Sequence, residues 1–383
     1  MIKNLFRLPW TEFDNPNGWI EPTTYCNLSC PGCYRSIDKL SHKPEHQPLE
    51  ELLRQIDWFV AHRNIHTLSI SGGDPILYPD ILEVVKYASN KKLKVLLYTN
   101  GLALNKKLLV ALRDAGVTQF LLHIDRYQSR PDLNELTSVT ELKQQFCDLF
   151  RTVEGTLLGF IQPLSSDHYQ EDVASTSNIA RRNIDVVSLI VFTLYREVCW
   201  EKNVKETIAT NLTIKEVVDT FKYHDGFIPA AYLPSTDSSS DPTWLFGARI
   251  AAPQKLLGYF SPRLYRLSHM KYRKKTGKYL FISQKNILKT NQLLKFFYIK
   301  PVMKIWLRSV LLRVTGKVSN QRTIWFQTIL LLRGPEKKGA EWDLCAGCPD
   351  RIIFTNRLLP SCILEDLKNK DNSKYKSVEH NDR

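Results

Sequence analysis

Between residues 17 and 198 the chain alternates between short apolar runs and stretches with helical spacing of apolar residues. Apolar runs of this length predict buried strands, and apolar positions at i, i+3 and i+4 predict amphipathic helices. The expected strands are Gly18–Thr23, His66–Ser71, Leu93–Thr99, Gln119–Ile124, Thr156–Gln162 and Val186–Leu194. The expected helices are Leu49–His62, Pro79–Asn90, Lys106–Ala115, Val139–Val153 and Ser165–Arg182. Six such repeats predict an α/β fold with parallel strands and right-handed crossovers, a partial (βα)6 barrel.

In the remainder of the chain the composition and the expected structure change several times. Residues 201–250 predict a connector with one helix, Ile214–Tyr223, and an exposed Ser-rich loop at 234–242. The next ninety residues, rich in Lys and Arg, predict a mostly helical basic region. Two short runs turned at Asn356 then predict a small cysteine-bearing hairpin. The expected domains are 1–16 (N-terminal extension), 17–200 (core barrel), 201–250 (connector), 251–340 (basic amphipathic helices), 341–366 (hairpin) and 367–383 (disordered tail).

Three of the eight cysteines lie on one predicted loop, directly after the first strand. Cys26, Cys30 and Cys33 form a C-x3-C-x2-C group within eight residues. Thiolates this close together can hold a metal or a cluster without help from distant sequence. A structural zinc site normally has four protein ligands, so three predict an open site. A [4Fe-4S] cube held at three corners fits this group, with zinc or a disulfide as the alternatives.

Gly72-Gly73-Asp74-Pro75 ends the second expected strand, about forty residues after the cysteine loop. Together the two motifs resemble the radical S-adenosylmethionine (SAM) superfamily. The resemblance implies a partial TIM-like barrel and a [4Fe-4S] cluster whose open iron is bound by the amino and carboxylate groups of SAM. An electron from a flavodoxin- or ferredoxin-type donor would then release a 5′-deoxyadenosyl radical, which abstracts hydrogen from a substrate. Members usually carry an aromatic residue just before the third Cys, where this chain has Gly32; Tyr34, just after it, is the expected cofactor contact.

Further SAM contacts are expected at the carboxyl ends of the barrel strands. The resemblance assigns Gly72, Gly73, Asp74 and Pro75 to SAM, since glycines permit close approach and a carboxylate accepts from an ammonium group. An ordinary Gly-Gly turn is the alternative. Asn100 and Asp125 are the expected contacts on the next tips, although Asn100-Gly101 is also a common turn signal. His123 and Gln162 are weaker expectations, and His123 is equally consistent with a satisfied core histidine.

Two other cysteines are isolated. Cys147 lies on an amphipathic helix and is expected to be a small buried hydrophobe. Cys199 follows the sixth strand and is interpreted as an inert thiol, or alternatively as part of the mouth of the site.

A second cysteine group, C-x2-C-x13-C, comprises Cys345, Cys348 and Cys362. The predicted hairpin between the second and third of them brings Cys362 back beside the pair. The spacing is similar to the auxiliary-cluster motif of the radical SAM cyclase that acts on GTP in molybdenum-cofactor synthesis, and to half of the SPASM/twitch extensions. The resemblance implies a second [4Fe-4S] cluster on these three residues. A zinc knuckle completed by a distant residue is the alternative.

Composition excludes some classes of protein. The apolar fraction of 43% is sufficient for a large core. The first ten residues contain no uninterrupted apolar segment typical of a secretion signal, and no apolar run reaches the length of a membrane span. Cysteine used as metal ligands is typical of a reducing compartment. We therefore expect a cytoplasmic iron–sulfur protein.

The positive charge of the chain is concentrated in one segment. Residues 255–338 contain 20 Lys and Arg against one acid, Glu336, which gives +19 in a chain of net +14. Lys300, Lys304 and Arg308 recur at i, i+4 and i+8 and so share one helix face. Such a face, with aliphatic and aromatic neighbours, predicts an anionic bilayer as partner. Binding of nucleic acid is less favoured, and a basic insert that packs on the barrel remains an alternative.

These patterns predict a radical SAM enzyme with two iron–sulfur clusters, peripheral on the inner face of the membrane. A lipid, a lipid-linked molecule or another small molecule is the expected substrate. Modification of RNA or of a peptide is the alternative within enzymes. A metal-binding nucleic-acid protein without turnover is the alternative outside them.

Overall fold

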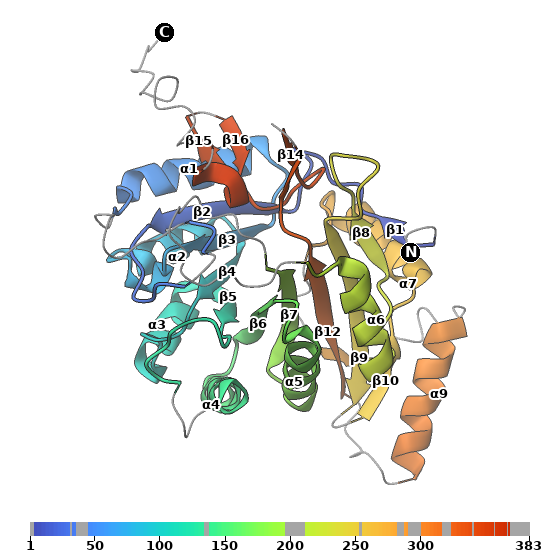
Figure 1. The fold of residues 1–383 in the computed structure, drawn as a ribbon. Helices are drawn as coiled ribbons and strands as arrows, with labels where there is room; N and C mark the ends of the chain where they lie inside the picture. Colours follow the sequence, from blue (N-terminus) through green and yellow to red (C-terminus); the bar gives the residue numbers. More distant parts are fainter. Residues whose placement is uncertain are drawn as a thin grey trace.

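In a computed structural model, six parallel strands form the centre of one curved sheet (Figure 1). The structure describes residues 4–30, 33–35, 45–133, 138–195, 211–252, 255–281, 287–289, 300–315, 323–338, 341–355, 357–365 and 367. The six strands are β2 (Asn17–Thr23), β3 (Thr67–Gly72), β4 (Lys94–Thr99), β5 (Val117–His123), β6 (Leu157–Leu164) and β7 (Val187–Leu194). They pair in chain order. The α/β partial barrel predicted from the sequence is confirmed; the strand ends differ from the prediction by at most two residues, and the helix expected from Ser165 begins at Tyr169.

Helices cover the outer face of these strands (Figure 1). They are α1 (Leu49–His62), α2 (Ile81–Asn90), α3 (Lys106–Ala115), α4 (Val139–Arg151), α5 (Tyr169–Arg182) and α6 (Ile214–Asp225). A 3-10 turn, η1 (Pro75–Leu77), follows β3. Alternate strand residues such as Val95, Leu97 and Phe120 point outward into a large apolar core with these helices. Cys147 is fully buried in that core, as predicted.

The inner face of the sheet has two layers. In the first layer Leu96, Leu121 and Leu189 contact Leu8 and Trp10 of the N-terminal segment, together with Tyr265 and Phe281 from later in the chain. These side chains fill the barrel at the amino-terminal part of its strands. One pleat further along, nearer the carboxyl ends of the strands, the inner side chains line a cavity instead. These packed side chains therefore confine the cavity to the carboxyl ends of the strands, where both cysteine groups lie.

Strands from the second half of the chain, together with a short N-terminal strand, extend the sheet beyond β7. They are β12 (Thr323–Leu332), β9 (Trp244–Ala252), β8 (Ala231–Leu233) and β1 (Phe6–Arg7), with β10 (Lys255–Tyr259) and β11 (Ile287–Lys289) at the side. β12 runs parallel to β7 and antiparallel to β9. The sheet stays open, with β1 and β2 at its two ends. The N-terminal extension and the connector therefore contribute strands to the same sheet.

The prediction of a mostly helical basic region is wrong in part. Where the structure describes this region, its helices are α7 (Pro262–Thr276) and α9 (Lys300–Val314), and β10 and β11 are strands. The run from Thr323 to Leu332, interpreted from its aliphatic clusters as part of that helical region, is a strand. Its residues alternate between two buried faces, Ile329 and Leu331 outward and Leu330 inward. A strand buried on both sides is continuously apolar, so its sequence does not distinguish it from a buried helix.

A small cap closes the top of the molecule in Figure 1. It consists of β13 (Glu336–Lys338) paired with β14 (Glu341–Asp343), then β15 (Arg351–Phe354) paired with β16 (Arg357–Pro360), and the turn η2 (Ser361–Ile363). The hairpin prediction is confirmed, although Asn356 itself lies outside the described residues, as do Cys199 and residues 368–383. Ile352 and Leu364 pack on Trp19 of β2. The Ser-rich loop is not fully exposed: Ser235 is buried and bonds Asp343.

His269 of α7 is buried without a hydrogen-bond partner for either ring nitrogen among the described residues. Burial, with a smaller contribution from Arg273, lowers the pKa of His269 to about 4. Because the unfolded chain then binds an extra proton between pH 4 and 6.5, stability falls as the pH drops through that window. We expect His269→Phe to reduce this loss by about 2 kcal/mol at pH 5. Urea unfolding at pH 5 and 7.5 measures the difference; parallel pH-dependence in the two proteins would contradict it.

Candidate functional site

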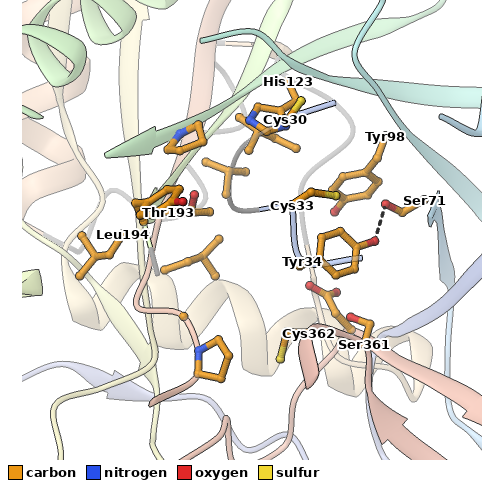
Figure 2. A pocket seen from close by; sticks show the side chains of 18 of the residues that line it. Cys30, Cys33, Tyr34, Ser71, Tyr98, His123, Thr193, Leu194, Ser361 and Cys362 are labelled. Carbon is orange, nitrogen blue, oxygen red and sulfur yellow. Dashed lines mark hydrogen bonds between the residues drawn. The ribbon is translucent and has the colours of Figure 1, made fainter. Parts of the chain in front are cut away.

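A cavity of about 380 Å³ opens at the carboxyl ends of the strands, beneath the cap. Both cysteine groups contribute to its wall. Figure 2 shows Cys30 and Cys33 on one side of the opening and Cys362 across from them. The cysteines that line it are Cys26, Cys30, Cys33, Cys345, Cys348 and Cys362. Two groups separated by more than 300 residues in the sequence therefore share one chamber.

The first cysteine loop crosses directly over the end of β3. Gly73 donates its backbone N–H to Thr23 O at 2.8 Å, and Asp74 donates to Tyr25 O at 2.8 Å. A Cβ on Gly73 would lie 2.1 Å from Tyr25 O, and one on Gly72 would lie 2.6 Å from Thr23 O. Any larger residue at these two positions would displace the loop that begins at Cys26. Both glycines also line the cavity, so a ligand can approach their backbone.

Asp74 and Pro75 lie behind the cavity wall and do not line it. The Asp74 side chain is fully buried and accepts hydrogen bonds from Thr99 Oγ1 at 2.8 Å, Asn100 N at 3.1 Å and Ile76 N at 3.3 Å. Burial raises the pKa of Asp74 to about 6. In this structure the carboxylate joins the tips of β3 and β4. The sequence had led us to expect it to face a ligand.

Amide donors surround the Cys26 sulfur. Leu28 N lies 3.5 Å from Cys26 Sγ, and the side-chain amide of Asn100 lies 3.6 Å from it. The same amide donates to Asn27 at 2.7 Å. Asn100 thus contacts the first cysteine group and lines the cavity, as expected for a residue at this strand tip. Hydrogen bonds to sulfur stabilise its anionic form and tune a bound cluster.

Asp125 and His123, at the tip of β5, both line the cavity and pair with each other at 2.7 Å (Nε2 to Oδ2). Asp125 also accepts from the backbone of Tyr127 at 2.6 Å. Although burial opposes ionisation, His123 and these bonds lower the pKa of Asp125. The neighbouring Gln128 also lines the cavity, and its Oε1 accepts from Asp125 N at 3.3 Å. Gln162, a weaker candidate, does not reach the cavity and holds Lys143 at 2.7 Å.

Tyr34 lines the cavity, but its hydroxyl points into the barrel wall. It donates to Glu21 Oε1 at 3.0 Å and lies 3.2 Å from Ser71 Oγ (Figure 2). Arg35 bridges the same Glu21 at 3.0 Å and Glu365, just beyond Cys362, at 2.6 Å. Glu21 therefore anchors the end of the first cysteine loop, and Arg35 ties that loop to the cap.

The second cysteine group lies where the cap meets β2. Cys345 is close enough to raise the pKa of Cys348, and burial, with a contribution from Cys348, raises the pKa of Cys362. Asp350, deeply placed beside them, lines the cavity and accepts from Asn17 Nδ2 at 3.3 Å. Burial raises the pKa of Asp350 to about 7. The Ser-rich loop fixes the start of this group, since Ala346 N donates to Pro234 O at 2.9 Å.

The rest of the cavity wall is mainly apolar. Arg333 is the one Lys or Arg that lines it within the described residues, and that guanidinium is neutralised by Asp343 at 2.6 Å and Glu336 at 2.5 Å. The apolar and aromatic lining comprises Trp19, Leu28, Tyr98, Ile161, Pro163, Val191, Leu194, Trp244, Phe281, Leu330, Leu332 and Leu344. A buried cation that is already paired offers little to a phosphate group. The chamber is thus suited to a largely apolar ligand with a few polar atoms.

The donor sets are chemically suited to clusters. Burial raises the pKa of Cys26, Cys30 and Cys362, so these thiols stay protonated until a cation compensates their charge. No three His, Cys, Asp or Glu side chains converge on a single ion in the described part of the chain. The thiolates of a four-iron cube bind different irons and need not converge on one point. The residues therefore fit a cube better than a single ion.

The predicted site residues differ in whether they reach the cavity. Tyr34, Gly72, Gly73, Asn100 and Asp125 line the cavity with both cysteine groups. Asp74 and Pro75 do not. Sequence reasoning overlooked the inner-facing residues Trp19, Tyr98 and Trp244, together with Asp350. The alternation of side chains along each strand could have identified the first three, since each occupies an inward position near a strand end.

Comparison with known proteins gives one family match: residues 20–197 match the Radical SAM superfamily. The AdoMet-dependent heme synthase of Methanosarcina barkeri is 35% identical over 105 residues, which is 27% of this chain and 30% of that protein. The GTP 3′,8-cyclase of Alkaliphilus metalliredigens is 34% identical over 130 residues, 33% of this chain and 39% of that protein. The chain thus spans only about a third of the length of these relatives.

Among solved structures, Streptococcus suis SuiB bound to the precursor peptide SuiA is similar, with 17% identity and a TM-score of 0.43. The similar region covers 56% of this chain and 46% of that one.

Proposed function

Because residues 20–197 make this chain a member of the radical SAM superfamily, we propose that it is an enzyme that abstracts hydrogen from a largely apolar, lipid or lipid-linked substrate. The superfamily uses a [4Fe-4S] cluster and SAM, which together supply a 5′-deoxyadenosyl radical when bound. Cys26, Cys30 and Cys33 would hold that cluster. Gly72, Gly73, Asn100 and Asp125 would surround SAM, with Asp74 fixing the two strand tips between them.

One observation carries the choice of substrate: apart from its cysteines and a few polar tips, the shared cavity is walled by aliphatic and aromatic side chains. A nucleotide would need cations for its phosphates, and Arg333 is already paired with two carboxylates. This argues against carrying over the GTP substrate named for one relative. Water is excluded from such a wall, which protects a radical from quenching.

Cys345, Cys348 and Cys362 would hold a second [4Fe-4S] cluster on the opposite side of the cavity. A substrate between the two groups would be close to both. The second group could then orient the substrate or take up an electron after hydrogen abstraction. The cap would at the same time close the open side of the barrel.

The basic helices supply a membrane-facing surface in this proposal. On α9, Ile305 is buried against β10, whereas Lys304 and Arg308 are exposed beside Leu307 and Leu311, which are 50% and 61% exposed. No helix among the described residues is long and apolar enough to cross a bilayer. Cations beside exposed leucines, with almost no neighbouring acids, match an anionic bilayer surface in charge and polarity.

The test has two arms, both on the full chain. In the first, the anaerobically reconstituted protein is given dithionite and SAM, and 5′-deoxyadenosine is measured with and without a total lipid extract. Stimulation by lipid but not by RNA or by a peptide mixture supports the proposal. Stimulation by RNA or peptide alone would overturn the substrate class.

The second arm is flotation with anionic phosphatidylglycerol vesicles and neutral phosphatidylcholine vesicles. Each surface cation contributes about 1 kcal/mol near an anionic bilayer, so Lys304→Glu/Arg308→Glu should weaken binding by about 30-fold or more. The matched control is Lys106→Glu/Lys107→Glu on α3, on the opposite side of the molecule (Figure 1), which should bind as wild type. Equal failure of wild type to bind either vesicle would remove the membrane surface from the proposal.

A further inference from the structure

Arg63 is among the largest fully buried side chains of the molecule, 1% exposed at the end of α1. Where the structure describes the chain, the hydrogen-bond partners of its side chain are all backbone carbonyls. Nε donates to Glu12 O at 2.8 Å, Nη1 to Asn17 O at 2.7 Å and to Pro349 O at 3.0 Å, and Nη2 to Cys348 O at 2.6 Å. The guanidinium thus reaches from the barrel to the loop that carries the second cysteine group.

This cation has no anionic partner in contact. Among the described residues no carboxylate oxygen lies within 4.0 Å of its nitrogens, whereas the other large buried arginine, Arg249, is paired with Asp225 at 3.1 Å. A buried charge that meets only neutral dipoles is costly. Glu12, Asp350 and Arg351 are the other charged residues close to the Arg63 guanidinium, and none of them forms an ion pair with it.

We propose that Arg63 is the counter-charge and positioning residue of the second cluster, holding the Cys348 loop by its carbonyls and offsetting the negative charge of the cluster thiolates. The inference rests on the second cluster of the proposed function. A cube with three thiolate ligands is an anionic group. The Arg63 guanidinium, which donates to the Cys348 carbonyl and has no carboxylate in contact, supplies a positive charge beside it. The positive charge of Arg63 and the negative charge of the second cluster then compensate each other.

Neighbouring residues fix the same loop without charge. Asn15, fully buried, donates its side-chain amide to Gly347 O at 3.0 Å and to Cys348 O at 3.4 Å. Gly347 has φ +78°, and a Cβ there would lie 2.3 Å from Trp10 O. Asn15 therefore contributes position alone, which makes it the matched control for Arg63.

The experiment uses the full chain carrying Cys26→Ala/Cys30→Ala/Cys33→Ala, so that any cluster belongs to the second group. Iron content is measured after anaerobic reconstitution, and the reduction potential is measured by a titration followed by electron paramagnetic resonance. In this background Arg63→Gln and Arg63→Met remove the charge, and Arg63→Lys keeps it. Asn15→Ala removes uncharged contacts only, to backbone carbonyls and to Asn17 N, and Arg249→Gln removes a buried guanidinium that pairs with Asp225 and does not line the cavity.

Loss of a neighbouring positive charge disfavours reduction. We therefore expect Arg63→Gln and Arg63→Met to lower cluster affinity 10- to 100-fold and to shift the potential of loaded protein to more negative values. Arg63→Lys should keep a near-native potential. Asn15→Ala should lower the iron content without changing the reduction potential. Arg249→Gln should change neither the iron content nor the potential. Circular dichroism identifies which of the two neutral variants is folded.

An unchanged potential and loading in a folded neutral variant would overturn the role of Arg63 while leaving the second cluster in place. Failure of the background protein itself to take up iron would instead overturn the second cluster, and with it this inference.

Discussion

Replacing Cys26, Cys30 and Cys33 together by alanine should abolish release of 5′-deoxyadenosine from SAM and remove about four iron atoms per chain. The three residues line the cavity and belong to a single loop. Without their thiolates the first cluster has no ligands, and so SAM has no source of an electron. Anaerobic reconstitution, iron analysis and chromatography of the nucleoside measure both effects.

The matched control is Cys147→Ala. That thiol is on the buried face of α4, in the core outside the barrel, so its loss should lower stability without changing iron content or SAM cleavage. Continued nucleoside release by the triple variant would remove the radical mechanism from this chain, whereas equal loss in the Cys147 control would point to unfolding.

The second large effect is expected from Cys345→Ala/Cys348→Ala/Cys362→Ala. This variant should lose about four iron atoms per chain, those of the second cluster. It should still cleave SAM slowly but form no product from the substrate. The two groups belong to separate loops of the cavity wall, so we expect the first to assemble without the second. Iron and zinc analysis, nucleoside release and substrate turnover are compared with wild type.

Two outcomes would contradict this expectation. One zinc per chain in wild type, lost in the variant, would establish the zinc knuckle in place of a cluster. Full turnover by the variant would show that the second group serves the fold alone.

Much of the barrel was predictable because its signals are local. The helix from Leu49 to His62 and the helix from Lys106 to Ala115 begin and end as expected. Each carries an apolar stripe of helical spacing, and Asn105 caps the second by accepting from Leu108 N at 3.0 Å. The cysteine loops were equally visible, since the spacing of thiols along a loop is itself a feature of the sequence.

The far half of the sheet was not predictable in this way. Residues Thr328–Leu332 pair with Leu189–Thr193, some 140 residues earlier in the chain. The continuously apolar sequence of β12 is compatible with a buried helix as well as with a strand. Only pairing with β7 on one side and β9 on the other decided between them, because the free energy comes from contacts that are distant in sequence.

The sequence by itself determined the candidate residues for the chemistry: two cysteine groups, a glycine pair and a series of strand tips, placed by short-range periodicity on one edge of a parallel sheet. The tertiary structure alone decided where those side chains point. It turned Asp74 away from the cavity and placed Arg63 behind Cys348, with apolar residues of the later strands forming the wall opposite the first cysteines. The direction of a side chain depends on what packs against it, and that neighbour is often hundreds of residues away.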